Sequence, residues 1–308
     1  MQNIAETNEK TSPEYFGFQW HITSKCPGQC AHCYQSEGQN DDELSLDALK
    51  HIADGIMRAL PCPVTINVTG GEPLAYRAGE KERAVFGLLE HLCGFENLDE
   101  LNIITSGMGV DADALSRLRA LPRLAQVKVS LESHDKIIND RLRWPGNYEM
   151  ALKSIRALTG AGLSVVIMST LSRYNYICVK GLRDLSEDIG ASGVIFERFV
   201  PLGRGAQEMG DATLERAQWD EVLRALAEIS CAETSKLAPY KAFWVEGDAV
   251  RGAPCCLGRT SMALMPDGTV YPCRRVPRPI GKLPGDGMER ILAKLGPFGS
   301  TPQLCYNF

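Results

Sequence analysis

Every second residue in the first structured stretch of the chain is a large apolar one: Phe16, Phe18, Trp20 and Ile22. This period of two predicts a strand, which follows a polar tail over residues 1–13. Apolar residues then recur at helical spacing between Ser45, a good N-cap, and Leu60, so a helix is expected there. A strand followed by a helix is therefore the first unit of the fold.

The same unit recurs along the chain. Further strands are expected at residues 64–69, 101–105, 127–131, 163–170 and 194–200, and further helices at residues 80–94, 111–121, 147–160, 177–189 and 214–230. Six strand–helix units imply right-handed crossovers and a parallel sheet, which can stay open or curl into a partial barrel. We interpret the chain as an α/β protein with a partial (β/α)6 TIM-like barrel.

The faces of the predicted strands indicate a hollow barrel. Residues 127–131 place apolar side chains on one face and polar ones on the other, whereas a parallel strand covered on both faces is nearly all apolar. An antiparallel sheet with one solvated face is the alternative, which the intervening helices disfavour. The polar faces are expected to line a cavity, with Gln19, His21, Asn67, Thr69, Lys128, Ser130 and Glu132.

Composition and charge argue against several classes of function and favour others. A net charge of −5 and a pI near 5.7 argue against nucleic acid as a partner, because phosphate-backbone binders are usually basic. The N-terminus lacks the apolar core of a signal peptide, and the chain has no run of 18 apolar residues, so neither secretion nor a membrane span is expected. Eleven cysteines in such a chain favour metal binding or catalysis over disulfides. We expect a cytoplasmic protein.

Cys26, Cys30 and Cys33 follow the first predicted strand with Cys-x-x-x-Cys-x-x-Cys spacing. Thiolates this close on a Pro-Gly loop can converge on one soft metal centre, either zinc or an iron–sulfur cluster. Three protein ligands leave one position open, which is typical of a reactive site, since structural zinc takes four. Core or zinc-finger cysteines are the alternative. The sequence therefore predicts an iron–sulfur loop at the carboxyl end of a strand.

A second motif, Gly70-Gly71-Glu72, ends the second predicted strand. Consecutive glycines let backbone approach a ligand, and the carboxylate can accept hydrogen bonds from an ammonium group. By itself this motif more often forms a turn. Active sites of parallel barrels gather at the carboxyl ends of the strands, where the cysteine loop is also expected. The motif is therefore interpreted as an amino-acid clamp.

Together the two motifs resemble those of the radical SAM superfamily. The resemblance implies that the three cysteines bind a [4Fe-4S] cluster, whose open iron chelates S-adenosylmethionine and whose electron cleaves it to a 5'-deoxyadenosyl radical that abstracts hydrogen from substrate. Gly70, Gly71 and Glu72 would hold the methionine ammonium group, and His32 takes the aromatic position before the third cysteine.

The resemblance also implies further cofactor contacts. Ser130 would contact the methionine carboxylate or the ribose, and Arg143 would pair with the carboxylate, although Arg141 is close enough to compete. Ser106, in Thr-Ser-Gly, and Val200, in Val-Pro-Leu-Gly, fall where the family contacts ribose and adenine. Ordinary turns are the alternative at these last two positions.

The C-terminal quarter resembles the SPASM and Twitch extensions of the superfamily. Pro-Asp-Gly268 between two apolar runs predicts a hairpin with cysteines on both arms. The resemblance implies one auxiliary iron–sulfur cluster, because the longer SPASM cysteine run is missing; a zinc ribbon is the alternative. Its ligands would come from Cys255, Cys256, Cys273 and Cys305. The expected organisation is a barrel over residues 14–232 and this extension over residues 233–308.

Cys178 lies just after the fifth predicted strand, near a helix start that would favour its thiolate, so it is a candidate catalytic residue. A buried, inert thiol is the default for it and for Cys62, Cys93 and Cys231.

Most relatives of this subgroup modify peptides by oxidative crosslinking, epimerisation or side-chain oxidation, so a peptide is the expected substrate. Oxidation or rearrangement of a small polar metabolite is the alternative, and a non-enzymatic metal protein is a third class. An external electron donor of the flavodoxin or ferredoxin type is implied. Only 25 residues precede Cys26, too few for a leader-recognition domain, so a separate peptide-recognition protein is a further expected partner.

Overall fold

A computed structural model describes residues 15–35, 43–77 and 83–300; the predicted tail over residues 1–13 and Cys305 lie outside this part. Its centre is a run of six parallel strands in sequence order. These strands are β1 (Phe16–His21), β2 (Val64–Thr69), β3 (Leu98–Thr105), β4 (Leu124–Ser130), β5 (Val165–Leu171) and β6 (Gly193–Arg198). All six predicted strands are present.

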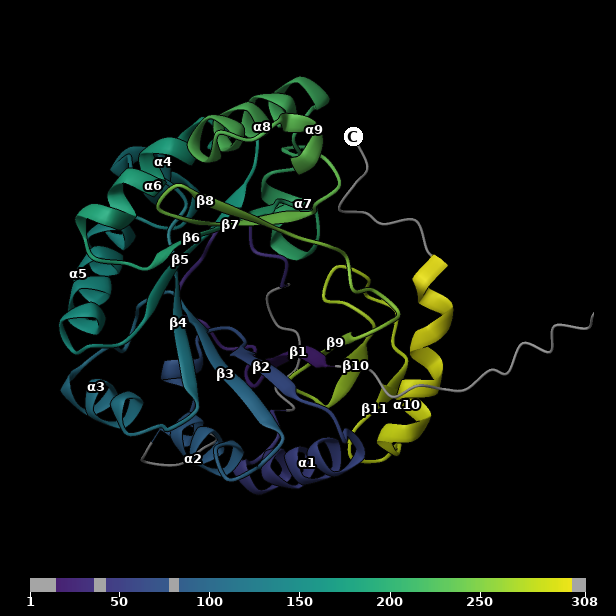
Figure 1. The fold of residues 1–308 in the computed structure, drawn as a ribbon. Coiled ribbons are helices and arrows are strands. Elements are labelled where there is room, and N and C mark those ends of the chain that lie inside the picture. The colour runs from purple at the N-terminus through teal and green to yellow at the C-terminus, as the bar shows by residue number, and fades with distance from the viewer. Residues whose placement is uncertain (1–14, 36–42, 78–82, 301–308) are drawn as a thin grey trace, which may run out of the picture.

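Helices follow the strands and cover the outer face of the curved sheet (Figure 1). The helices predicted from the sequence are α1 (Leu46–Ala59), α2 (Ala84–Leu92), α3 (Ala112–Arg119), α5 (Asn147–Gly160), α6 (Val179–Asp188) and α8 (Arg216–Ser230). The sheet curls without closing, which confirms the partial (β/α)6 barrel.

Local signals explain where the helices begin. The side chain of Ser45 accepts a hydrogen bond from the amide of Ala48, 3.2 Å away, and so caps α1 as predicted. Helix α5 spans the residues expected for it, and its N-cap is Gly146, with φ 85°. Glycine reaches this left-handed conformation without the steric cost that a side chain would bring.

The apolar strand faces form the core together with the helices. Phe16, Trp20 and Ile66 are fully buried in it. On the opposite, inner face, Lys128 Nζ donates a hydrogen bond to Asn67 Oδ1 at 2.8 Å, deep in the barrel. Burial lowers the pKa of Lys128 to about 8, with nearby Glu100 and Glu197 opposing the shift. The interior is therefore polar and partly filled by its own side chains.

The C-terminal segment extends the sheet at both edges. Strands β7 (Ala242–Glu246) and β8 (Ala249–Ala253) continue antiparallel from β6. Strand β9 (Ser261–Leu264) pairs parallel with β1, and β10 (Thr269–Tyr271) and β11 (Gly281–Lys282) follow antiparallel. The hairpin predicted around Gly268 is confirmed, with φ 84° at that glycine. The sheet crosses the expected boundary after residue 232, and that domain division stays a prediction.

Several short elements were not predicted. They are α4 (Lys136–Leu142), α7 (Gly203–Glu208), α9 (Thr234–Leu237), α10 (Met288–Leu295) and the 3-10 turns η1 (Pro73–Ala75), η2 (Tyr176–Cys178) and η3 (Gly296–Ser300). Within the described ranges, no helix is both long and apolar enough to cross a bilayer.

Candidate active site

The three clustered cysteines lie on the loop after β1, at the carboxyl end of the parallel strands. They line one cavity of about 450 Å³. Cys30 is buried, Cys33 is half-buried and Cys26 is exposed. Burial raises the pKa of the Cys30 thiol to about 11, against the opposing effect of nearby Arg143. Metal binding there would have to release a proton from this thiol.

Gly70 and Gly71 hold the start of the cysteine loop. The amide of Gly71 donates to the carbonyl of Thr23 at 2.7 Å, and the amide of Glu72 donates to the carbonyl of Lys25 at 2.9 Å. A Cβ on Gly70 would lie 2.5 Å from the Thr23 oxygen, and one on Gly71 would lie 2.1 Å from the Lys25 oxygen. Both glycines line the cavity, but the space beside them is filled by the loop, so loop packing alone already requires glycine there.

The rest of the loop is packed as closely. A Cβ on Gly28 would lie 2.4 Å from the ring of Trp144, and one on Gly203 would lie 2.3 Å from the carbonyl of Tyr34. The amide of Gly205 donates to the carbonyl of Cys33 at 2.7 Å. Contacts from three separate segments of the protein therefore hold the cysteine loop in place without a cofactor.

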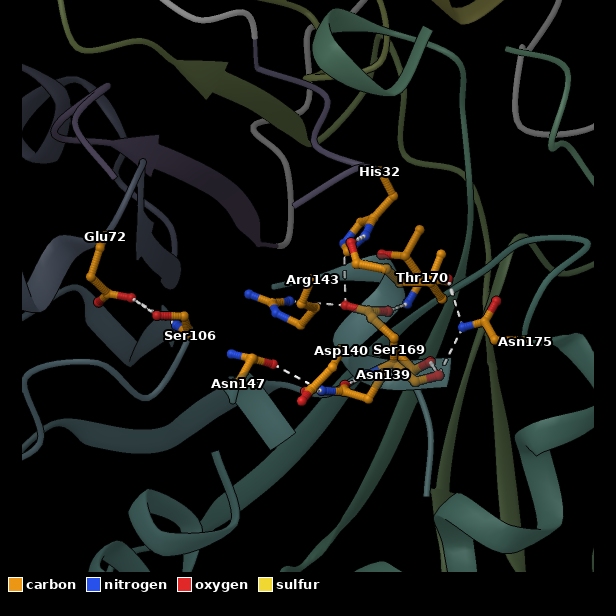
Figure 2. A network of polar contacts seen from close by, with 12 residues as sticks. His32, Glu72, Ser106, Asn139, Asp140, Arg143, Asn147, Ser169, Thr170 and Asn175 are labelled. Carbon is orange, nitrogen blue, oxygen red and sulfur yellow. Dashed lines mark hydrogen bonds and ion pairs between the residues drawn. The ribbon is translucent and has the colours of Figure 1, made fainter. Parts of the chain in front are cut away.

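A buried network connects the loop to β4 and α4 (Figure 2). Glu132 Oε1 accepts from Arg143 at 2.9 Å and lies 3.2 Å from His32 Nε2, while Glu132 Oε2 accepts from the Thr170 amide at 2.7 Å. Burial alone would raise the pKa of Glu132, but His32 and Arg143 bring it below its usual value. His32 Nδ1 also lies 3.2 Å from the carbonyl of Leu142. Glu132 therefore orients both His32 and Arg143.

The Nε atom of Arg143 is buried and makes no hydrogen bond within the described part of the chain. Its guanidinium lines the cavity beside the cysteines. Arg141, the competing candidate, instead lies over the ring of Tyr174 at 5.3 Å and is not among the described lining residues. A buried donor without a partner is costly, so Arg143 fits a ligand carboxylate better than Arg141 does.

Glu72 is fully buried, and its carboxylate is already satisfied by protein donors. Oxygen Oε1 accepts from Thr105 Oγ1 at 2.7 Å and from the Leu74 amide at 3.1 Å, and Oε2 accepts from the amide and hydroxyl of Ser106 at 2.8 and 2.5 Å. Burial nevertheless raises its pKa. Glu72 is not among the described lining residues of the cavity. The ammonium contact of Glu72 stays a prediction, and the structure adds a second role, the bracing of β3.

Replacement of Glu72 by glutamine is expected to destabilise the fold. The amide nitrogen would face one of these donors, so at least one buried hydrogen bond is lost and one donor is left unpaired, at about 1 to 3 kcal/mol. Thermal unfolding followed by circular dichroism measures the effect, with the exposed Glu90→Gln as the matched control. An unchanged melting temperature combined with weaker S-adenosylmethionine binding would show that Glu72 faces the cofactor instead.

The remaining predicted cofactor residues lie around the same cavity. Ser106 at the end of β3, Ser130 at the end of β4 and Val200 after β6 all line it, as do His32 and Arg143. Of the seven polar residues predicted to line the interior, Gln19, Thr69, Ser130 and Glu132 do so. His21, Asn67 and Lys128 are not among the described lining residues; His21 is buried against Tyr34 and Gln35, and Lys128 contacts Asn67 below the cavity.

The C-terminal cysteines lie at one end of the β9–β10 hairpin. Cys255 and Cys256 precede β9, and Cys273 follows β10, so the antiparallel turn brings both arms back to the same side. Among the described residues, no three Cys, His, Asp or Glu side chains are already gathered around one metal position. The ligand set of an auxiliary cluster therefore stays a prediction.

Cys178 is buried at the start of α6, and its sulfur lies 3.2 Å from Ser133 Oγ. Burial raises its pKa, which disfavours the reactive thiolate. It is not among the described residues that line the cavity. These observations fit an inert thiol better than the predicted catalytic one.

Sequence reasoning missed the charged side of the cavity. Glu197 at the end of β6, Arg204 on α7, and Arg274 and Arg275 after β10 all line it. The sequence does show the polar alternation of β6 and the Arg-Arg pair next to Cys273. It does not show the sheet order that brings these residues to the same cavity.

The chain resembles known proteins in both sequence and structure. The family model of the radical SAM superfamily matches residues 20–185. The chain is similar to mycofactocin maturase MftC of Mycobacterium tuberculosis, with 26% identity over 262 residues, 82% of this chain and 63% of that protein. It is also similar to the antilisterial bacteriocin subtilosin biosynthesis protein AlbA of Bacillus subtilis, with 23% identity, covering 92% of this chain and 60% of that protein. The chain thus spans just under two thirds of these relatives.

Solved structures share the fold. SuiB of Streptococcus suis bound to precursor peptide SuiA superposes with a TM-score of 0.66 at 13% identity, over 94% of this chain and 67% of SuiB. The protein anSMEcpe with bound AdoMet gives a TM-score of 0.71 at 13% identity, over 96% of this chain and 84% of that one. Since the family match covers more than half of the sequence, the chain belongs to the radical SAM superfamily, and its similarity to the maturases supports the SPASM/Twitch subgroup.

Proposed function

We propose that the protein cleaves S-adenosylmethionine reductively and uses the resulting radical to abstract hydrogen from a peptide that is being matured. One observation carries the proposal: one cavity at the carboxyl ends of the parallel strands is lined by the three cysteines, by Gly70 and Gly71, and by Arg143, whose buried Nε has no hydrogen-bond partner among the described residues. Three thiols suit a soft iron–sulfur centre with an open position, and an orphaned guanidinium nitrogen suits a carboxylate.

Cys26, Cys30 and Cys33 would hold a [4Fe-4S] cluster, which when bound supplies the electron for S-adenosylmethionine cleavage. Arg143 would bind the methionine carboxylate, and Glu132 would keep its guanidinium in place. His32 would remain tied to Glu132, so the loop between the second and third cysteine could not turn away from the cavity. Family resemblance assigns the ribose and adenine to Ser106 and Val200, and the methionine carboxylate or the ribose to Ser130; all three line the cavity.

A second cluster at the hairpin supports net oxidation of the substrate. Cys273 is followed directly by Arg274 and Arg275, which line the cavity, so an electron acceptor held by Cys273 would lie next to the substrate chamber. Cys255, Cys256 and Cys305 are the other candidate ligands. A flavodoxin or ferredoxin would supply electrons to the first cluster in the cytoplasm.

The names of relatives support a peptide substrate. MftC is named a maturase, AlbA is named a bacteriocin biosynthesis protein, and SuiB was solved with a precursor peptide. A small-molecule substrate is the second candidate, because an AdoMet-dependent heme synthase of Nitratidesulfovibrio vulgaris is also similar, with 27% identity over 223 residues. A separate recognition protein would deliver the peptide in the first case.

Turnover by the anaerobically reconstituted protein tests the proposed function. With dithionite and S-adenosylmethionine it should release 5'-deoxyadenosine, and a precursor peptide encoded beside its gene should become lighter by two hydrogen atoms in mass spectrometry. The absence of 5'-deoxyadenosine from fully iron-loaded protein would refute the proposed activity. Its formation with a peptide that is unchanged both in mass and in the configuration of its residues would redirect the search to small molecules.

A further inference from the structure

Glu132, which holds Arg143 and His32, lies just beyond the end of strand β4 and is buried. The register of β4 with β5 ends at Ser130 and Met168, and the amide of Leu131 still donates to the carbonyl of Met168 at 3.0 Å. The backbone of Glu132 lies past this ladder. A buried amide and a buried carbonyl both need hydrogen-bond partners, so the partners of Glu132 must come from outside the two strands.

Two asparagine side chains supply these partners (Figure 2). Asn139 Oδ1 accepts from the Glu132 amide at 2.9 Å, and Asn175 Nδ2 donates to the Glu132 carbonyl at 2.8 Å. Both asparagines are fully buried. The backbone of Glu132 is therefore held from two sides, by α4 and by the segment that follows β5.

The local structure does not explain why asparagine occupies these two positions. Asn175 is the N-cap of η2, where an asparagine oxygen usually accepts from the first amides of the helix. Its oxygen instead accepts from the amide and the hydroxyl of Ser172, at 2.8 and 2.9 Å. Asn139 lies inside α4, although asparagine is a poor helix former. Residues that act against their local preference are expected where function requires them.

Asn139 also contacts the backbone of Arg143. Arg143 is the C-cap of α4, and its amide donates to the carbonyl of Asn139 at 2.9 Å. Arg143 Nη1 in turn donates to Glu132 Oε1 at 2.9 Å, so Asn139 contacts both members of this buried ion pair. A shift of the Glu132 backbone would move its carboxylate, and with it the guanidinium of Arg143 that lines the cavity.

We propose that Asn139 and Asn175 are positioning residues, which hold Glu132 so that Arg143 presents its guanidinium to the carboxylate of S-adenosylmethionine. This inference rests on the proposed function and specifies how its cofactor site is kept in place. Neither asparagine is among the described residues that line the cavity, so both act through Glu132. A donor that is already fixed loses less conformational entropy when the ligand binds, which favours binding.

Titration calorimetry of the iron-loaded protein without reductant tests the inference apart from turnover. The two ligands are S-adenosylmethionine and decarboxylated S-adenosylmethionine, which differ only in the carboxylate. Asn175→Ala and Asn139→Ala should each weaken S-adenosylmethionine binding about tenfold, because a displaced Arg143 loses a charge-assisted hydrogen bond. The decarboxylated ligand should bind both variants as it binds wild type. Helix α4 should persist in Asn139→Ala, since alanine is the best helix former.

The matched control is Asn97→Ala. Asn97 Nδ2 donates to the backbone carbonyls of Met57 and Leu60, at 2.9 and 2.8 Å, just as Asn175 Nδ2 donates to two backbone carbonyls. Asn97 is not among the described residues that line the cavity. The control therefore loses the same kind of hydrogen bonds, but its affinity for both ligands should equal that of wild type.

A double variant separates positioning from general destabilisation. Arg143→Gln should itself weaken S-adenosylmethionine binding, and the addition of Asn175→Ala should weaken it no further, because no guanidinium is left to position. Iron content and circular dichroism establish that each variant is folded, and Asn139→Ala decides the question if Asn175→Ala does not fold.

Equal weakening of both ligands by a folded asparagine variant would overturn the inference, as would a further loss of affinity in the Arg143→Gln background. The asparagines would then support the fold alone. The proposed function is judged separately by 5'-deoxyadenosine release. Failure of that reaction in a protein that still binds S-adenosylmethionine through its carboxylate would refute the radical chemistry, while the positioning role stands.

Discussion

Simultaneous replacement of Cys26, Cys30 and Cys33 by alanine should abolish 5'-deoxyadenosine formation. The three thiols lie on one loop in the cavity wall, although among the described residues neither they nor any other three metal-binding side chains are already gathered around one metal position. Without them the electron for S-adenosylmethionine cleavage has no carrier. Chromatographic quantification of 5'-deoxyadenosine after anaerobic reconstitution measures the loss, which should reach the limit of detection.

The matched control is Cys231→Ala, which removes an exposed thiol at the end of α8, away from the cavity lining. This variant should retain full cleavage. The fold of the triple variant should survive, because the hydrogen bonds of Gly71, Glu72 and Gly205 with the loop join backbone atoms. Cleavage retained by a folded triple variant would contradict the assignment.

Replacement of Cys273 by alanine should remove the second cluster and leave the first one in place. Wild-type protein is expected to contain about eight irons, and the variant should fall towards four while the first cluster stays loaded. The variant should still produce 5'-deoxyadenosine but should not complete the oxidised product. Hydrogen abstraction leaves a substrate radical, and formation of a new bond from it requires loss of one more electron and a proton; the second cluster would accept that electron.

Loss of the ligand could also unfold the hairpin, because cluster binding contributes to folding free energy. Circular dichroism must therefore accompany the iron count for Cys273→Ala. About four irons and one zinc in wild-type protein would make the extension a structural zinc site. About four irons and no zinc would remove the auxiliary cluster, and the oxidative step would need another electron acceptor.

Strong local signals made most of the barrel predictable from the sequence. The strict alternation from Phe16 to Ile22 and the helical spacing after Ser45 need no tertiary information. In contrast, α4 has only seven residues, and β11 has only two, Gly281 and Lys282, so neither offers enough positions for a period to show. Strand β8 is defined by its pairing with β7 rather than by its own residues.

The site was predictable only where its residues are close in sequence. The spacing of Cys26, Cys30 and Cys33 predicted a shared iron–sulfur site. The structure places all three in the wall of one cavity, and the cluster itself stays a prediction. Glu132 was expected only as a lining residue, because its contact with His32 joins segments one hundred positions apart. The four hydrogen-bond donors around Glu72 could not be predicted from the sequence either, because two of them belong to Ser106 and one to Thr105, at the end of another strand.

Strand β1 lies between β2 and β9, and these two partners are synthesised at very different times. Val64 provides one neighbour soon after Phe16 is made, whereas Ser261 provides the other only near the end of the described chain. At ribosomal rates of about 5 to 20 residues per second, one edge of β1 stays unpaired for about 10 to 50 s. An apolar strand with an open edge can pair with other chains during this interval. The nascent protein is therefore most vulnerable to aggregation before β9 emerges, and shielding of β1 by a chaperone would matter more than at any later stage.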